Sequence, residues 1–395
     1  MRCWFAPAVL TGIENPIKRC LTPGNKFGLF LDKYDPSWFT DLAMFQHPHM
    51  LVSYYYSGKI QNYRKRLRVR DDVTLWADSG GYSVATKSAV INPYEVLKWQ
   101  EANSNIAFSL DKPPTIVTGT GRVWPGKNER VDAATLEKHA QISRQNNIIF
   151  RDNRTSDKLL IYNVLHGYDL PTKELWWDYV TRDTQFEGYC VGVRPATDAL
   201  LAAMSIMFVY NKGVRERLHV LGVSGITVIP MMVWASQYID KLSFDSSSYG
   251  YGSRTRAYVY PDRIRDYTHF GRKFLTKDNP MNKIYCKCPI CVHFTDAEYF
   301  CKSDITWPGM LLSLHNLWCL KEYVAQLEQA LIVEKDQKKF FDIVNKNTGD
   351  WADKTMYAIN FIESCIKIGF KASYDLYFSD HEFSKTKLKR NRLIT

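Results

Sequence analysis

Short apolar runs alternate with longer stretches of helical character through most of this 395-residue chain. Runs of four to eight apolar residues are typical of buried strands. They lie at 106–110, 159–165, 189–193, 218–223 and 242–245, and earlier strands are predicted at 27–34, at 50–56 and in the run ending at Asp78. Helices are predicted between them, at 133–145, 172–182, 196–211 and 227–239. Another opens at Asn92–Pro93, because proline is favoured at a first helical position.

This alternation predicts βαβ units and therefore a parallel sheet. Seven or eight such units favour a closed (β/α)₈ TIM barrel, an α/β fold, over an open doubly wound sheet. The open sheet is an alternative, although no Gly-x-Gly-x-x-Gly fingerprint follows the first strands. In a barrel, polar residues at strand ends project onto one face, where active sites gather. We expect that face to carry Asp78, Asp111, His166 and Asp245.

The strand–helix pattern breaks after Arg263, and a cysteine-rich irregular segment is followed by a long helix that begins near Pro308. We therefore expect a barrel with N-terminal strands over 1–278 and an inserted zinc-binding segment over 279–320. Helices and a basic tail, packed on the barrel, are expected over 321–395.

Three cysteines lie within six residues, in Cys286-Lys-Cys288-Pro-Ile-Cys291. Cysteines on a tight turn supply ligands to a structural zinc ion, which needs four nitrogen or sulfur ligands. Four ligands leave no position for water, so this zinc would be structural. The fourth ligand is not determined by spacing. The candidates are His293, Cys301, His315 and Cys319, and we favour His315 because it lies on a helix.

The formal net charge of +11 indicates a polyanionic partner. One basic run includes Arg64, Lys65 and Arg66 and follows a tyrosine-rich segment, an arrangement that suits unpaired bases and phosphates. The basic residues at 385–392 are equally consistent with a solvated tail. No apolar stretch approaches the ~20 residues that span a bilayer, and the start lacks the plan of a secretion signal. We expect a cytoplasmic protein without a membrane partner.

Several motifs together resemble those of the tRNA-guanine transglycosylases. These are Asp78-Ser79-Gly80-Gly81-Tyr82, Val220-Leu221-Gly222-Val223, Phe244-Asp245 followed by Arg254 and Arg256, and the three cysteines followed by His315-Asn316-Leu317. The family consists of zinc-containing (β/α)₈ pentosyltransferases that exchange guanine for a 7-deazaguanine. The resemblance covers about residues 70–330 and implies that His315 is the fourth zinc ligand.

The resemblance also implies roles for the strand-end residues. Asp245 would be the nucleophile and Asp78 the general acid/base, as in a retaining glycosidase that passes through a covalent glycosyl-enzyme. A base-binding group would include Asp111, which would read the N1–H and 2-amino edge of guanine, together with Tyr82, His166, Gly167, Gly192, Val193, Leu221 and Gly222. Arg254 and Arg256 would bind phosphate near the target nucleotide.

The chain departs from the family where bases are read. The family's Gln-Gly appears as His166-Gly167, and its Gly-Gly-Leu as Gly192-Val193-Arg194. This pattern resembles the branch in phages and bacterial genomic islands that inserts 7-deazaguanines of the preQ0 type into DNA, in the host cytoplasm if phage-encoded. Exchange on tRNA, a non-catalytic nucleic-acid-binding relative and an irreversible base hydrolase are the alternatives. A homodimer is possible.

Overall fold

The computed structural model describes residues 3–9, 35, 37–87, 90–118, 121–123, 131–192, 198–223, 225–250, 257–269, 286–293 and 307–378. In this part of the chain, eight parallel strands form one sheet in the order β1-β10-β9-β8-β7-β4-β3-β2. They are β1 (Cys3–Pro7), β2 (His49–Ser53), β3 (Thr74–Asp78), β4 (Ile106–Phe108), β7 (Leu160–Leu165), β8 (Gly188–Gly192), β9 (Arg217–Leu221) and β10 (Lys241–Ser246).

The sheet curls into a nearly closed barrel. Its two edge strands meet through a parallel bridge between Ala8 and Leu51, and the Val9 amide donates to the Leu51 carbonyl at 2.7 Å. The predicted (β/α)₈ barrel is therefore confirmed. The strand that completes it, β1, was not predicted, and the predicted strand at 27–34 lies outside the described residues.

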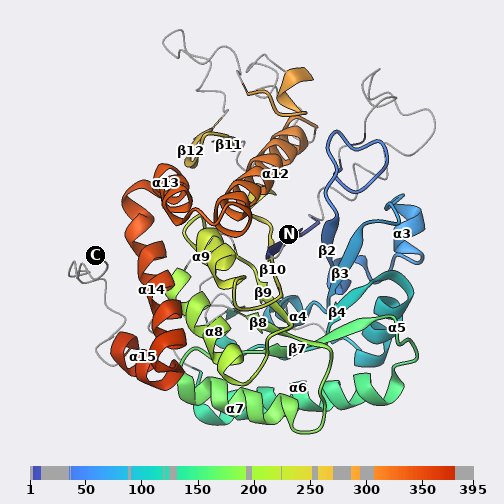
Figure 1. Ribbon diagram of the computed structural model, residues 1–395. Helices are drawn as coiled ribbons and strands as arrows, with labels where there is room; N and C mark the ends of the chain where they lie inside the picture. Colours follow the sequence, from blue (N-terminus) through green and yellow to red (C-terminus); the bar gives the residue numbers. More distant parts are fainter. Residues whose placement is uncertain are drawn as a thin grey trace.

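Helices surround the barrel (Figure 1). In chain order these are α2 (Tyr54–Ser57), α3 (Tyr63–Arg66), α4 (Gly81–Lys87), α5 (Pro93–Asn103), α6 (Ala133–Asn153), α7 (Leu170–Thr181), α8 (Ala199–Asn211) and α9 (Val228–Ala235). The Asn92 side chain caps α5 by accepting from the Tyr94 amide at 2.9 Å, as the sequence predicts. The expected strand at 50–56 ends at Ser53, and the following tyrosines begin α2.

Successive side chains of each strand point to opposite faces of the sheet, and this alternation divides the hydrophobic core into two parts. One face of each strand packs on the helices, and the other fills the lumen. Aromatic and aliphatic side chains fill this lumen, namely Ala6, Leu51, Trp76, Ile106, Phe108, Tyr162, Val164 and Cys190. Asp78 follows the lumen-facing Trp76 by two residues in β3, so its side chain points to the same inward face of the strand.

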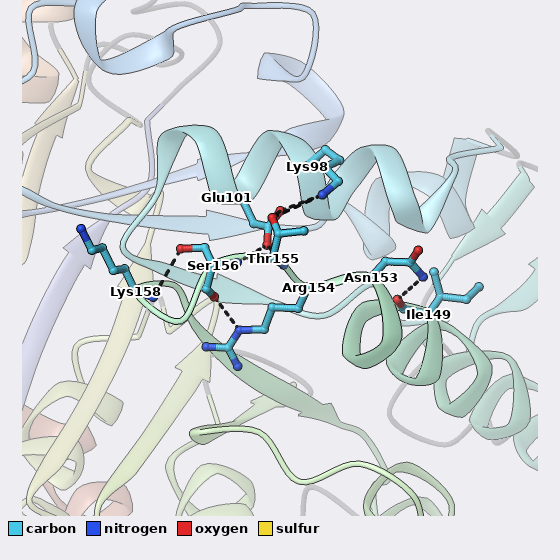
Figure 2. A network of polar contacts seen from close by, with 8 residues as sticks. All are labelled: Lys98, Glu101, Ile149, Asn153, Arg154, Thr155, Ser156 and Lys158. Carbon is cyan, nitrogen blue, oxygen red and sulfur yellow. Dashed lines mark hydrogen bonds and ion pairs between the residues drawn. The ribbon is translucent and has the colours of Figure 1, made fainter.

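A polar network braces the end of the barrel where the strands begin (Figure 2). The Glu101 carboxylate, near the end of α5, accepts hydrogen bonds from the Thr155 and Ser156 amides and from the Thr155 hydroxyl. Lys98 Nζ lies 3.3 Å from Glu101, and Arg154 donates to the Ser156 carbonyl at 2.8 Å. The network fixes the loop that enters β7, on the face opposite the strand ends.

Two small antiparallel pairs and several helices complete the described chain. The pairs are β5 (Ile116–Thr118) with β6 (Gly121–Val123) and β11 (Ala257–Tyr260) with β12 (Arg263–His269). The later helices are α12 (Trp307–Glu328), α13 (Gln337–Thr348), α14 (Ala352–Ile368) and α15 (Phe370–Phe378), with a π-helical turn at Gln329–Val333. Of the helices described here, none has the length and apolar content that crossing a bilayer requires.

The later helices pack on the barrel. The helix α14 lies beside α8 and α9 (Figure 1), and its Glu363 accepts hydrogen bonds from Trp234 Nε1 at 2.7 Å and from the Tyr238 hydroxyl at 2.5 Å. At the end of α12, Glu328 accepts a hydrogen bond from the Cys3 amide at 2.8 Å. Strand β1 is therefore held both by its strand neighbours and by a helix far away in the sequence.

Candidate active site and metal centre

Three carboxylates converge at the end of the barrel where the strands finish. Asp78 ends β3, Asp111 lies in the segment after β4, and Asp245 lies in β10. The pKa of the Cys190 thiol in the lumen is raised well above its usual value, first by burial and then by the charges of all three carboxylates. The three acids therefore act on one region at the mouth of the barrel.

Asp78 has the properties of a proton carrier. Burial is the largest cause that raises its pKa, to about 6, and the negative charges of Asp111 and Asp245 raise it further. The Ser53 hydroxyl and the Gly80 amide act in the opposite direction. A carboxyl group with a pKa near 6 is suited to give and take a proton close to neutral pH.

Asp245 has a different environment, because a backbone amide and a histidine ring nitrogen both contact one of its oxygens. Its side chain is largely buried, and Oδ1 accepts a hydrogen bond from the Gly222 amide at 2.7 Å. The Nε2 atom of His219 lies 3.2 Å from the same oxygen. Donors stabilise the charged form of a carboxylate, which is the form that a nucleophile requires. Gly222, predicted to contact the base, thus contacts Asp245.

Asp111 is paired with His166. The distance from His166 Nε2 to Asp111 Oδ2 is 2.6 Å, and both side chains are buried. Two glycines make room for the pair: a Cβ at Gly81 would lie 2.3 Å from Asp111 Oδ1, and one at Gly192 would lie 2.7 Å from His166 Nδ1. Any larger residue at these two positions would displace the pair.

Other predicted base-binding residues lie close by or outside the described chain. Tyr82, in the first turn of α4, is 52% exposed. Gly167 follows His166 directly with a φ of 109°, which favours glycine. Leu221 lies at the end of β9 and packs on the lumen cluster. Val193, Arg254 and Arg256 lie outside the described residues.

The basic run has a mixed character. Arg64 donates to the Val73 carbonyl at 2.8 Å and lies 3.3 Å from Asn105 Oδ1, so it fixes the segment that enters β3. Lys65 and Arg66 on the same short helix α3 are exposed. Of the three residues in this run that were predicted to bind nucleic acid, Lys65 and Arg66 are thus accessible, whereas Arg64 makes contacts within the chain.

Cys286, Cys288, Cys291 and His315 form a compact cluster. Their ligand atoms lie within 4.8 Å of one another. The distances from His315 Nδ1 to the three sulfurs are 3.8, 3.3 and 3.4 Å. A tetrahedral zinc ion with bonds of about 2.3 Å to sulfur and 2.0–2.1 Å to nitrogen separates such atoms by about 3.6 Å. The cluster therefore fits a tetrahedral metal ion.

The other three candidate ligands lie outside the cluster or outside the described residues. Cys319 Sγ is 3.5 Å from Nε2 of His315, on the side of the ring that faces away from the cluster. His293 is exposed, and Cys301 lies outside the described residues. The preference for His315 agrees with the cluster.

Contacts around His315 connect the cluster to the strand end of Asp245. His315 Nε2 lies 2.8 Å from the Val259 carbonyl, the contact that orients metal-binding histidines. The neighbouring Asn316 accepts from the Val259 amide at 3.0 Å and donates to the Ala257 and Tyr249 carbonyls at 2.9 and 3.4 Å. Tyr249 belongs to the turn that directly follows β10.

No family model matches this chain. It is similar to a curated protein of Methanococcus aeolicus named tRNA-guanine(15) transglycosylase, with 22% identity over 267 residues. The alignment covers 66% of this chain and 37% of the relative, so the chain spans little more than a third of the length of the curated relative that it matches.

Sequence reasoning missed two contributors to the site. His219 lies under Asp245, and Ser53 lies beside Asp78 in the register of β2 and β3. His219 precedes Leu221 by two residues in the same strand, so both side chains point to the same, inward face of the barrel wall. This spacing was the signal in the sequence for His219. A lone histidine in an apolar run usually belongs to the core, so this signal by itself does not indicate a functional residue.

Proposed function

We propose that this chain is a guanine transglycosylase that replaces guanine in DNA with a 7-deazaguanine base of the preQ0 type. The observation that carries the proposal is the pairing of two different carboxyl groups at one barrel mouth. Asp78 has a pKa of about 6, and one oxygen of Asp245 is contacted by the Gly222 amide and by Nε2 of His219. A base-exchange enzyme needs one acid of each kind.

In the first half of the reaction, a lone pair of the Asp245 carboxylate forms a bond to C1′ as the bond from C1′ to the guanine nitrogen breaks. The electron pair leaves with guanine, and Asp78 supplies the proton that neutralises it. In the second half, Asp78 takes a proton from the incoming base, whose nitrogen attacks C1′ and releases Asp245. Two displacements retain the configuration of the sugar.

The Asp111–His166 pair would read the base. Asp111 would accept hydrogen bonds from the N1–H and 2-amino groups of guanine, which adenine does not offer together, and His166 would face O6 of the base. Tyr82 would stack on the ring, and Gly167, Gly192, Val193 and Leu221 would line its slot. A buried carboxylate without its donors costs several kcal/mol, which selects guanine-like bases.

DNA is proposed as the polymer because the departures from the family fall on base reading, at His166–Gly167 and Gly192–Val193. Lys65, Arg66, Arg254 and Arg256 would contact its phosphates. The target base would have to leave the stack or come from a single strand to reach Asp245. The zinc ion would be held by the three cysteines and His315 and would support the segment after β10. Exchange on tRNA is the second candidate, favoured by the name of the Methanococcus relative.

Trapping on a denaturing gel tests the function. The protein is mixed with DNA duplex, single-stranded DNA or tRNA, each with labelled guanine, and compared with Asp245→Asn. We expect a covalent band with DNA, lost in Asp245→Asn, and label release that exceeds one equivalent per enzyme only when a 7-deazaguanine base is added. Exchange with tRNA alone would refute the DNA assignment. Guanine release beyond one equivalent per enzyme without an incoming base would indicate a hydrolase, and no band with any polymer would indicate a binding protein.

A further inference from the structure

A histidine inside the barrel lies directly beneath the Asp245 carboxylate. His219 is completely buried in β9, and its ring packs against Trp76 and Phe108 with centroid separations of 5.1 and 4.7 Å. This apolar surrounding disfavours the charged ring, and burial lowers the pKa of His219. The motifs that suggested the catalytic residues do not include His219.

Its two ring nitrogens join two residues of the neighbouring strand. Nδ1 lies 3.0 Å from the Ser243 hydroxyl, and Nε2 lies 3.2 Å from Asp245 Oδ1. His219 and Ser243 are register partners in the parallel pairing of β9 with β10. The strand pairing therefore sets the position of the ring, which is rigid because both neighbours belong to the barrel wall.

Two arrangements of the hydrogen atoms are compatible with these contacts. A neutral ring that accepts the Ser243 proton at Nδ1 carries its own proton on Nε2, facing Asp245. The Ser243 hydroxyl also lies 3.2 Å from the Leu218 carbonyl. If the hydroxyl donates to Leu218 instead, Nδ1 of His219 carries a proton and donates to the Ser243 oxygen. Nε2 can then donate to Asp245 only if the ring is doubly protonated, and burial opposes that charged form.

We propose that His219 is a positioning residue that holds Oδ1 of Asp245, together with the Gly222 amide, so that Oδ2 is the oxygen that attacks C1′. Among the described residues, the hydrogen bonds to this carboxylate reach Oδ1. The reaction assigned to Oδ2 rests on the proposed function, whereas the hydrogen bond from His219 does not.

This division of the two oxygens has a consequence in each half of the reaction. When Oδ2 bonds to C1′, Oδ1 becomes the carbonyl oxygen of the ester, and the C1′–nitrogen bond gives its electron pair to the departing base. When the incoming base attacks, the C1′–Oδ2 bond breaks and its electron pair returns to the carboxylate. The two donors at Oδ1 stabilise that charge as it reappears, so they assist departure of the carboxylate.

The first test needs no catalysis. In protein labelled with ¹⁵N-histidine, the ring signals that disappear in His219→Gln belong to His219. We expect the neutral tautomer with the proton on Nε2. A ring with its only proton on Nδ1, and a bare Nε2 facing Asp245, would overturn the proposal. This measurement stays decisive even if the protein proves not to be a transglycosylase.

The second test compares two variants that remove the same ring. The amide nitrogen of His219→Gln can take the place of Nε2 as a donor, whereas His219→Phe fills the aromatic lumen without one. We expect His219→Phe to slow covalent adduct formation by about 10- to 100-fold and His219→Gln to stay within about fivefold of the unaltered protein. Equal loss in both variants, or no loss in His219→Phe, would show that the ring only packs. Thermal melts establish that each variant is folded.

Discussion

His166 Nε2 lies 2.6 Å from Asp111 Oδ2. The family that this chain resembles has a glutamine at the position of His166. Asp111, the carboxylate proposed to read the base, therefore has a buried histidine as its partner. Glycines at 81 and 192 leave the space that this pair occupies. The departure from the family motif at His166 is thus accommodated by the surrounding structure.

Removing the imidazole of His166 is expected to lower the affinity for the base more than it lowers the stability of the fold. His166→Ala should lower the affinity for a guanine-like base by about 10- to 100-fold, because a buried carboxylate loses a charge-assisted hydrogen bond. Calorimetric titration with guanine measures the loss. His166→Gln, which restores a donor, should recover much of the affinity, and adenine should bind poorly to every variant. Unchanged guanine binding in His166→Ala would remove His166 from the site.

Asp78→Asn is expected to stabilise the protein above pH 6. Because the folded-state pKa of Asp78 is about 6 and its usual value is 3.8, the folded state holds its proton more tightly than the unfolded state. The ionised group therefore costs stability above pH 6, and this cost falls as the pH drops from 6 to 4. We expect the free energy of unfolding at pH 7.5 to rise by about 1–3 kcal/mol.

Denaturant unfolding at pH 7.5 and at pH 4 measures this effect. The stabilisation by Asp78→Asn should be largest at pH 7.5 and small at pH 4, while covalent adduct turnover is abolished. Equal stability of the two proteins at pH 7.5 would mean that Asp78 is not buried beside other carboxylates.

The metal cluster gives a prediction with a close internal control. Cys288→Ser should lose about one equivalent of bound zinc per chain and lower the melting temperature, because structural zinc contributes to folding stability. Cys319→Ser should keep its zinc, since Cys319 lies on the other side of the His315 ring. Metal analysis after dialysis measures both. Zinc loss in Cys319→Ser together with retention in Cys288→Ser would reverse the ligand assignment.

The network around Glu101 should affect stability without affecting chemistry. Its hydrogen bonds lower the pKa of Glu101, although burial, the largest single cause, acts in the opposite direction. The stabilisation is therefore present above the usual pKa of 4.5 and is lost as the pH falls through the lowered value. At pH 7, Glu101→Gln should lower the free energy of unfolding by about 1–3 kcal/mol.

Chemical unfolding across pH, together with the trapping assay, checks this prediction. Asp157→Asn, an exposed change in the same loop, is the control and should change stability little. A large loss of adduct formation in folded Glu101→Gln would contradict the view that this end of the barrel serves stability alone.

Much of the fold could be predicted because its cause is local. Buried parallel strands require short apolar runs, and the predicted run at 242–245 is observed as Lys241–Ser246. The first strand was not predicted, because Cys3–Pro7 is a brief segment that ends in proline. It becomes a strand by pairing with β10. The tyrosines after Ser53 read as strand but form a helical turn, since β2 ends where its partner β3 ends at Asp78.

The sequence by itself determined the alternation of strands and helices, the acids at the strand ends and the three clustered cysteines, because each depends on residues close together in the chain. The tertiary structure decided which side chains meet across strands. It placed His219 beneath Asp245, joined His166 to Asp111 and brought Nδ1 of His315 to the cysteines. These contacts depend on strand order and register, which are set by the closure of the whole barrel and not by any single segment.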